Sequence, residues 1–148
     1  MRRRTPFFVA AALMVATVST PGCGSGADGR EAVEPIEAQG LRNIGKMYSI
    51  AAEKLSRPPN TIDEIRKVES EVPGGFSDLG ERDVAIYMGA KPAEGPEAAA
   101  TILAYDRNTP RQGGYALMLD GNVKMFSVDE FKSAKKAGAK PWTAPSEK

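Results

Sequence analysis

The chain has 148 residues, of which 41% are hydrophobic and 26% are charged, and its formal net charge at pH 7 is +1. This length predicts one domain with appendages. The sequence contains no histidine and one cysteine, which excludes an internal disulfide, a histidine general base, a Ser-His-Asp triad and zinc sites built from histidine and cysteine. Because the chain after Arg2 to Arg4 has a nearly neutral charge and contains no block of basic residues, nucleic-acid binding is not expected.

Residues 1–22 have the pattern of a signal peptide. A positive segment, Arg2 to Arg4, precedes an apolar run of 12 residues from Phe7 to Val18. A helix that spans a bilayer needs about 20 residues, so this run is too short to cross comfortably. We therefore expect export to the cell envelope, on the periplasmic side or at the outer membrane. A short anchor that is never cleaved is the alternative.

The only cysteine, Cys23, directly follows Gly22 at the end of this segment. A small residue before a cysteine at this place resembles a bacterial lipoprotein signal, although such signals usually carry an aliphatic residue where this chain has Thr20. The resemblance implies cleavage before Cys23, a lipid on its thiol and attachment to a membrane. The alternative is an ordinary cleavage site beside a free thiol that has no partner within the chain. Cleavage before Cys23 would remove Arg2 to Arg4, three of the 20 basic residues. The remaining chain would have 17 basic and 19 acidic residues, a net charge near −2.

Residues 23–35 are expected to form a lipid-anchored flexible linker, because this stretch is polar and has no apolar periodicity. An apolar stripe then predicts a helix from Ile36 to Ser56, since hydrophobic residues recur at spacings of three and four. Arg57-Pro58-Pro59 should end it. We expect the stripe to face a core; it consists of Leu41, Ile44, Tyr48, Ala51 and Leu55.

Two capping boxes predict two further helices. Thr61 with Glu64 should begin a short helix that stops before the Pro-Gly-Gly turn at 73–75. Ser127 with Glu130 should begin a helix from Val128 to Ala137. We expect Phe131 to dock this helix on a sheet and the lysines near its end to suit the helix dipole; these are Lys132, Lys135 and Lys136.

Alternating apolar residues predict an antiparallel sheet. In the first strand, Asp83 to Met88, even-numbered residues should face one side, and Ala85 and Tyr87 the other. The expected hairpin turns at Asp120-Gly121-Asn122, because Gly and Asn accept the positive φ of a tight turn. Loops are expected over 76–82, over 89–99 as a mobile excursion, and over 106–114. The other strands are expected at Thr101–Tyr105, Tyr115–Leu119 and Val123–Phe126.

These elements predict an α+β fold, in which an N-terminal amphipathic helix packs on a small antiparallel sheet and a short C-terminal helix follows. The folded domain should cover residues 36–138. Residues 139–148 are expected to be a disordered tail, in which the placement of Trp142 stays open.

Two segments carry a resemblance: LRNIGKMYSIAAEKLSRPPNTIDEI (41–65) and ILAYDRNTPRQGGYALMLDGNVKMF (102–126). They are similar to bacterial exported proteins related to type II secretion pseudopilins and type IV prepilins. Those proteins carry a histidine, nine intervening residues and Asp-Gly near the C-terminus. Here Asp120-Gly121 matches, but Pro110 stands at the histidine position, and a signal with Cys23 replaces the long membrane-inserting helix. The resemblance implies a pilin-like head detached from filament assembly.

The expected function is a non-enzymatic, lipid-anchored protein of the cell envelope, acting as a protein-interaction or structural module with an unknown envelope partner. An accessory subunit of a type II secretion or pilus-like assembly is the alternative. We expect no cofactor and no small-molecule substrate. An enzyme that uses carboxylates alone stays formally open, but it would need two carboxyl groups with divergent pKa values in one cleft.

Some pseudopilins that this chain resembles bind calcium in their C-terminal loops, which makes a calcium-binding head a further alternative. Oxygen ligands suited to calcium are available at Asp106, Asp120 and Asn122. Asp106 and Asp120 could approach each other at the ends of neighbouring strands. The competing interpretation is that Asp120 and Asn122 are turn residues only.

Overall fold

The computed structural model describes residues 35–75, 77 and 83–143. The predicted signal peptide, Cys23, nearly all of the predicted linker and most of the loop predicted over 76–82 lie outside these residues. In the part of the chain that is described, no helix is long and apolar enough to span a membrane. The fold below belongs to one compact unit that begins at Ala32.

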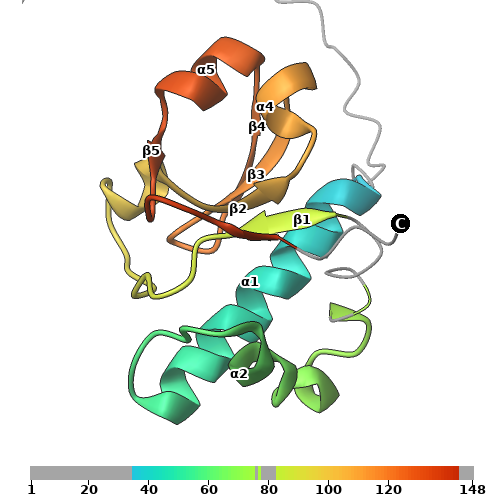
Figure 1. Cartoon of the computed structure of the whole chain (residues 1–148), viewed down its shortest axis with the longest axis vertical. Helices are drawn as coiled ribbons and strands as arrows, with labels where there is room; N and C mark the ends of the chain where they lie inside the picture. Colours follow the sequence, from blue (N-terminus) through green and yellow to red (C-terminus); the bar gives the residue numbers. More distant parts are fainter. Residues whose placement is uncertain (1–34, 76, 78–82, 144–148) are drawn as a thin grey trace, which may run out of the picture. The chain divides into compact units, whose positions relative to one another are not determined.

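The described residues form one six-stranded sheet with the order β4-β3-β2-β1-β6, and β5 pairs with β2 beside this path (Figure 1). All pairs along the path are antiparallel, whereas β5 runs parallel to β2. This confirms the α+β class and the small antiparallel sheet. The strands are β1 (Val84–Ile86), β2 (Thr101–Asp106), β3 (Gly114–Met118), β4 (Val123–Phe126), β5 (Lys135–Lys136) and β6 (Trp142–Thr143).

The longest helix, α1, runs from Ile36 to Leu55, as the apolar stripe predicted. Ser56 ends it in the left-handed conformation, and its backbone N–H bonds to the carbonyls of Ala52 and Glu53. The other helical segments are short. They are α2 (Ile62–Arg66), α4 (Thr109–Gln112), α5 (Val128–Ser133) and the 3-10 turns η1 (Glu69–Glu71) and η2 (Ala98–Ala100).

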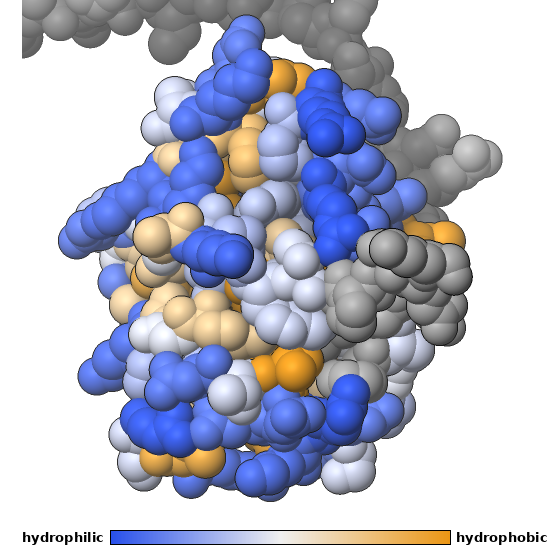
Figure 2. All heavy atoms as spheres, viewed as in Figure 1, coloured by the Kyte–Doolittle hydropathy of each residue, from blue (hydrophilic) through white to orange (hydrophobic). Residues whose placement is uncertain are grey.

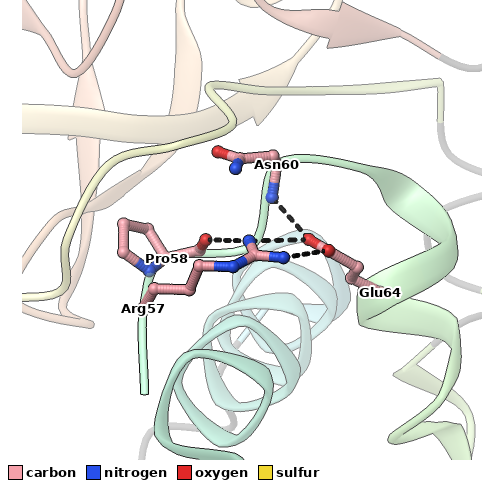
Figure 3. Close-up of polar contacts among 4 residues, drawn as sticks. All are labelled: Arg57, Pro58, Asn60 and Glu64. Atoms are coloured by element: carbon pink, nitrogen blue, oxygen red, sulfur yellow. Dashed lines mark hydrogen bonds and ion pairs between the residues drawn. The ribbon is translucent and has the colours of Figure 1, made fainter. Parts of the chain in front are cut away.

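The capping box predicted at the start of α2 does not form, because the Thr61 side chain makes no cap hydrogen bond. The Glu64 carboxylate instead accepts hydrogen bonds from the Arg57 guanidinium at 2.5 Å and from the Asn60 N–H at 2.7 Å (Figure 3). Charge-assisted bonds of this kind are stronger than neutral ones. The Arg57 guanidinium, together with the Asn60 N–H, lowers the pKa of Glu64 to about 2.

This ion pair predicts an acid-dependent loss of stability. Because folding lowers the pKa of Glu64 from its ordinary 4.5 to about 2, its stabilising effect is complete above pH 4.5 and is lost as the pH falls through that interval. Between pH 6 and pH 3, Glu64→Gln should therefore lose less stability in urea unfolding than the wild type does. Glu69→Gln, in η1, is the matched control and should lose as much as the wild type. Identical pH profiles for the wild type and Glu64→Gln would contradict this role.

Side chains of the sheet belong to two clusters of buried residues. They alternate along the strands except at Leu103 and Ala104 of β2, which share a cluster where the register against β3 shifts. Val84 and Ile86 of β1 belong to the first cluster. Ala85 of β1 and Tyr87, just after the strand, belong to the second. This confirms the faces predicted for this strand. The first cluster combines buried residues of α1 with residues of the three central strands, among them Leu41, Ile44, Tyr48, Leu103 and Leu117. The second contains Ile102, Tyr105, Ala116, Met118 and Phe131.

The capping box at the start of α5 forms as predicted, with both reciprocal hydrogen bonds between Ser127 and Glu130. Phe131 is 4% exposed and packs edge-on against Tyr105, with ring centroids 4.8 Å apart. The helix ends at Ser133, however, and not at Ala137 as predicted. Pairing with β2 ends it early: β5 lies beside β2, and the N–H of Ala137 donates to the Ile102 carbonyl at 2.9 Å.

The structure also corrects three predictions about loops. The segment 106–114 contains the one-turn helix α4, whose first turn accommodates Pro110. The segment 89–99, predicted to be a mobile excursion, is attached to α1 at its start and ends in η2, because the buried Tyr48 hydroxyl donates to the Ala90 carbonyl at 2.9 Å and accepts the Ala90 N–H at 3.0 Å. Residues 142–143, placed in the predicted disordered tail, form β6 on the outer edge of β1.

Candidate functional site

The two aspartates considered as calcium ligands lie at opposite ends of the β2–β3 pair. Asp106 is the last residue of β2, whereas Asp120 follows β3, and the register pairs Tyr105 with Ala116 and Ile102 with Met118. The prediction that they approach each other is wrong, because the carboxyl ends of antiparallel neighbours point in opposite directions.

Each aspartate is engaged in a local turn. Asp106 Oδ1 accepts the N–H of Asn108 at 2.8 Å, and Asp120 Oδ1 accepts the N–H of Asn122 at 3.0 Å. Asp120 Oδ2 also accepts the Asn122 side-chain amide at 2.8 Å, and Gly121 has a φ of 85°. These are the local contacts expected of turn residues. Within residues 35–75, 77 and 83–143, no group of three or more acidic or cysteine side chains is placed to hold a metal ion.

The candidate site is a hollow of about 340 Å³ lined by residues from the start of α1, the start of β1, the end of β2, α4 and the start of β3. We call it the α1–α4 hollow. Its floor is apolar, because Leu41 and Val84 are buried. Polar groups surround this floor. The lining consists of Glu37, Leu41, Val84, Asp106, Asn108, Thr109, Gln112, Gly113, Gly114 and Tyr115.

Two glycines shape the wall of the hollow. Gly113 has φ 75° and ψ −179°, a region that only glycine occupies readily. A Cβ at Gly113 would lie 2.7 Å from the carbonyl oxygen of Phe126, and one at Gly114 would lie 3.2 Å from Thr109 Oγ1. Thr109 is 1% exposed. The glycine pair therefore lets the chain pass directly from α4 into β3, with Gln112 and Tyr115 on either side of the bend.

Within the described ranges, 35–75, 77 and 83–143, the lining carries two carboxylates, Glu37 and Asp106, and no basic residue. The next residue along the chain, Arg107, forms an ion pair with Asp83 at 2.9 Å. The amino terminus of α1 supplies roughly half a positive charge, which is smaller than the two full negative charges. The hollow is thus a negatively charged cavity with an apolar floor.

A second exposed feature is β4, which forms the edge of the sheet. Its Met125 is 72% exposed. The exposed Lys124 of this strand donates a hydrogen bond from its ammonium group to the Ala99 carbonyl at 2.6 Å. On the face drawn in Figure 2, strongly apolar surface occurs only as small separate areas among hydrophilic residues.

No family model, no curated protein and no solved structure matches this chain.

Sequence reasoning anticipated part of the α1–α4 hollow. It named Asp106 as a candidate ligand and placed a turn around Gly113-Gly114, both of which line the cavity. It did not anticipate Glu37 or Gln112. Glu37 has no local signal, because only the tertiary fold brings the first turn of α1 to the end of β2.

Proposed function

We propose that this chain is a non-enzymatic, lipid-anchored protein of the cell envelope whose head binds another envelope protein or serves as a structural module. The observation that carries the proposal is the order of segments: a signal-like run, then Cys23, then a polar stretch, then a compact unit from Ala32 onwards. The absence of histidine from the sequence supports a non-enzymatic role, because histidine is the commonest general base.

We also propose that the head is pilin-like, with α1 packed on the hairpin of β3 and β4. Buried residues of α1 share a cluster with Leu103 and Leu117. A Cβ built on Gly45 would lie 2.9 Å from Cδ1 of Leu117, so the helix backbone and this strand come close together. Both contacts support the proposed packing.

The anchor is tested by growing cells that express the full chain with radiolabelled palmitate. The wild type should incorporate label, and Cys23→Ser should incorporate none, because the thiol is the acceptor. Ser25→Ala is the control and should label like the wild type, since it leaves Cys23 in place. Label that persists in Cys23→Ser would overturn the anchor.

An accessory subunit of a type II secretion or pilus-like assembly is the second candidate, favoured by the match at Asp120-Gly121. It predicts that crosslinking in the cell envelope followed by purification recovers secretion components with this chain. A monomer recovered without such components would contradict it. The calcium-binding alternative has less support, because Asp106 and Asp120 do not converge.

A further inference from the structure

We propose that the α1–α4 hollow binds a primary ammonium or guanidinium group on an aliphatic stem, presented by a lysine or arginine side chain of a partner protein. The inference deepens the proposed interaction function and rests on it for the identity of the partner. Binding of a small amine probe to the hollow can be measured independently of the lipid anchor.

The first argument is charge. Among the residues that the structure describes, Glu37 and Asp106 are the only charged ones in the lining, and two carboxylates outweigh the half charge at the amino terminus of α1. An anion placed here meets net repulsion, whereas a cation is attracted to both carboxylates. The carboxamides of Asn108 and Gln112 add oxygen atoms that accept hydrogen bonds from an ammonium group.

The second argument is the apolar floor. Leu41 and Val84 are buried beneath the hollow, and Tyr115 is half-buried in its wall. A strongly hydrated metal ion gains nothing from such a floor. Lysine and arginine side chains, in contrast, bury an aliphatic stem while keeping the charged group among polar partners. The Tyr115 ring can also attract the cation through its π face.

The third argument is size and preorganisation. A hollow of about 340 Å³ lies at the small end of ligand pockets, which start at roughly 300 Å³, and this suits one side chain. Asp106 is held by its bond from the Asn108 N–H, and the glycine pair fixes the wall. Binding therefore needs little ordering of the protein, which favours affinity.

The test uses the full chain in a mild detergent, observed by amide NMR during titration. The probes are n-butylammonium, Nα-acetyl-lysine methylamide and its neutral analogue Nα-acetyl-norleucine methylamide. We expect saturable shifts at Leu41, Gly114 and Tyr115, with a dissociation constant on the order of 1 mM for the cationic probes. The neutral analogue should produce no saturable shifts.

Charge-neutral variants identify the carboxylates. Glu37→Gln and Asp106→Asn should each weaken binding about fivefold, as for loss of one ion pair. Asp106→Asn keeps an oxygen to accept the Asn108 N–H. The matched controls are Glu53→Gln, which lies on α1 like Glu37, and Asp120→Asn. Asp120 resembles Asp106 because its carboxylate also accepts the N–H of the residue two positions later, Asn122. Neither control should change the affinity.

The outcomes separate the two sources of a cation. Tighter binding of Nα-acetyl-lysine methylamide than of n-butylammonium supports a partner side chain as the source of the cation. Equal affinities of these two probes overturn the protein partner in favour of a small amine. The cation site itself is overturned by an absence of saturable shifts, by equal binding of the norleucine analogue, or by controls that weaken binding as much as Glu37→Gln. The palmitate result is independent of all these outcomes, so failure of this inference is distinguishable from failure of the anchor.

Discussion

Replacing Leu117 by alanine is expected to destabilise the folded head by about 3 kcal/mol. Leu117 is 0% exposed and lies in β3, in the cluster that includes residues of α1. Truncation of a fully buried leucine removes its contacts and leaves a cavity, a change that costs roughly 2–5 kcal/mol. Urea unfolding of the variant and the wild type measures the difference, and a loss below about 1 kcal/mol would show that this residue is not central to the core.

Gly45→Ala, on the helix opposite Leu117, tests how α1 packs on β3. An alanine at Gly45 gains about 1 kcal/mol of helix propensity, but its Cβ would lie 2.9 Å from Cδ1 of Leu117. In the wild-type background the clash offsets this gain. In the Leu117→Ala background the obstacle is gone, so the double variant should be about 1 kcal/mol more stable than Leu117→Ala alone. Equal effects of Gly45→Ala in both backgrounds would contradict packing of α1 on β3.

Gly113→Ala should be as damaging as Leu117→Ala, with a cost of about 3 kcal/mol. Its backbone, at φ 75° and ψ −179°, lies in a region that costs an alanine roughly 1–3 kcal/mol. The new Cβ would also lie 2.7 Å from the Phe126 carbonyl oxygen, a backbone atom that cannot rotate away. Thermal unfolding of the variant measures the loss.

Gly121→Ala is the matched comparison for Gly113→Ala. Gly121 has a φ of 85°, but nothing lies within 4 Å of its Cβ position. Only backbone strain applies, so the cost should be about 1 kcal/mol. Equal losses in the two variants would show that the contact with Phe126 contributes nothing and that the wall of the α1–α4 hollow tolerates a side chain.

Much of the fold was predictable because several local signals agree. The apolar stripe predicted the extent of α1, Asp120-Gly121-Asn122 predicted the hairpin, and Ser127 with Glu130 predicted the start of α5. In each case the residues that determine the element lie within or beside it.

The errors near the carboxyl end occurred where a partner distant in sequence determines the outcome. Lys135 and Lys136 continue a helical pattern, but β2 recruits them into a strand. Trp142 carries no signal for a strand until β1 is in place beside it. The place of Glu37 in the α1–α4 hollow was unpredictable for the same reason, because Glu37 joins Asp106 only through the tertiary fold.

The position of β6 has a consequence for biogenesis. A chain is synthesised from its amino terminus, so β1 is complete well before the Trp142–Thr143 segment that pairs with its outer edge. Until that segment arrives, or permanently in a product trimmed before Trp142, β1 presents unpaired amides and carbonyls to neighbouring chains, a known route to aggregation. Proteolytic cleavage before Trp142 should therefore promote aggregation of the protein more than cleavage before α1 does.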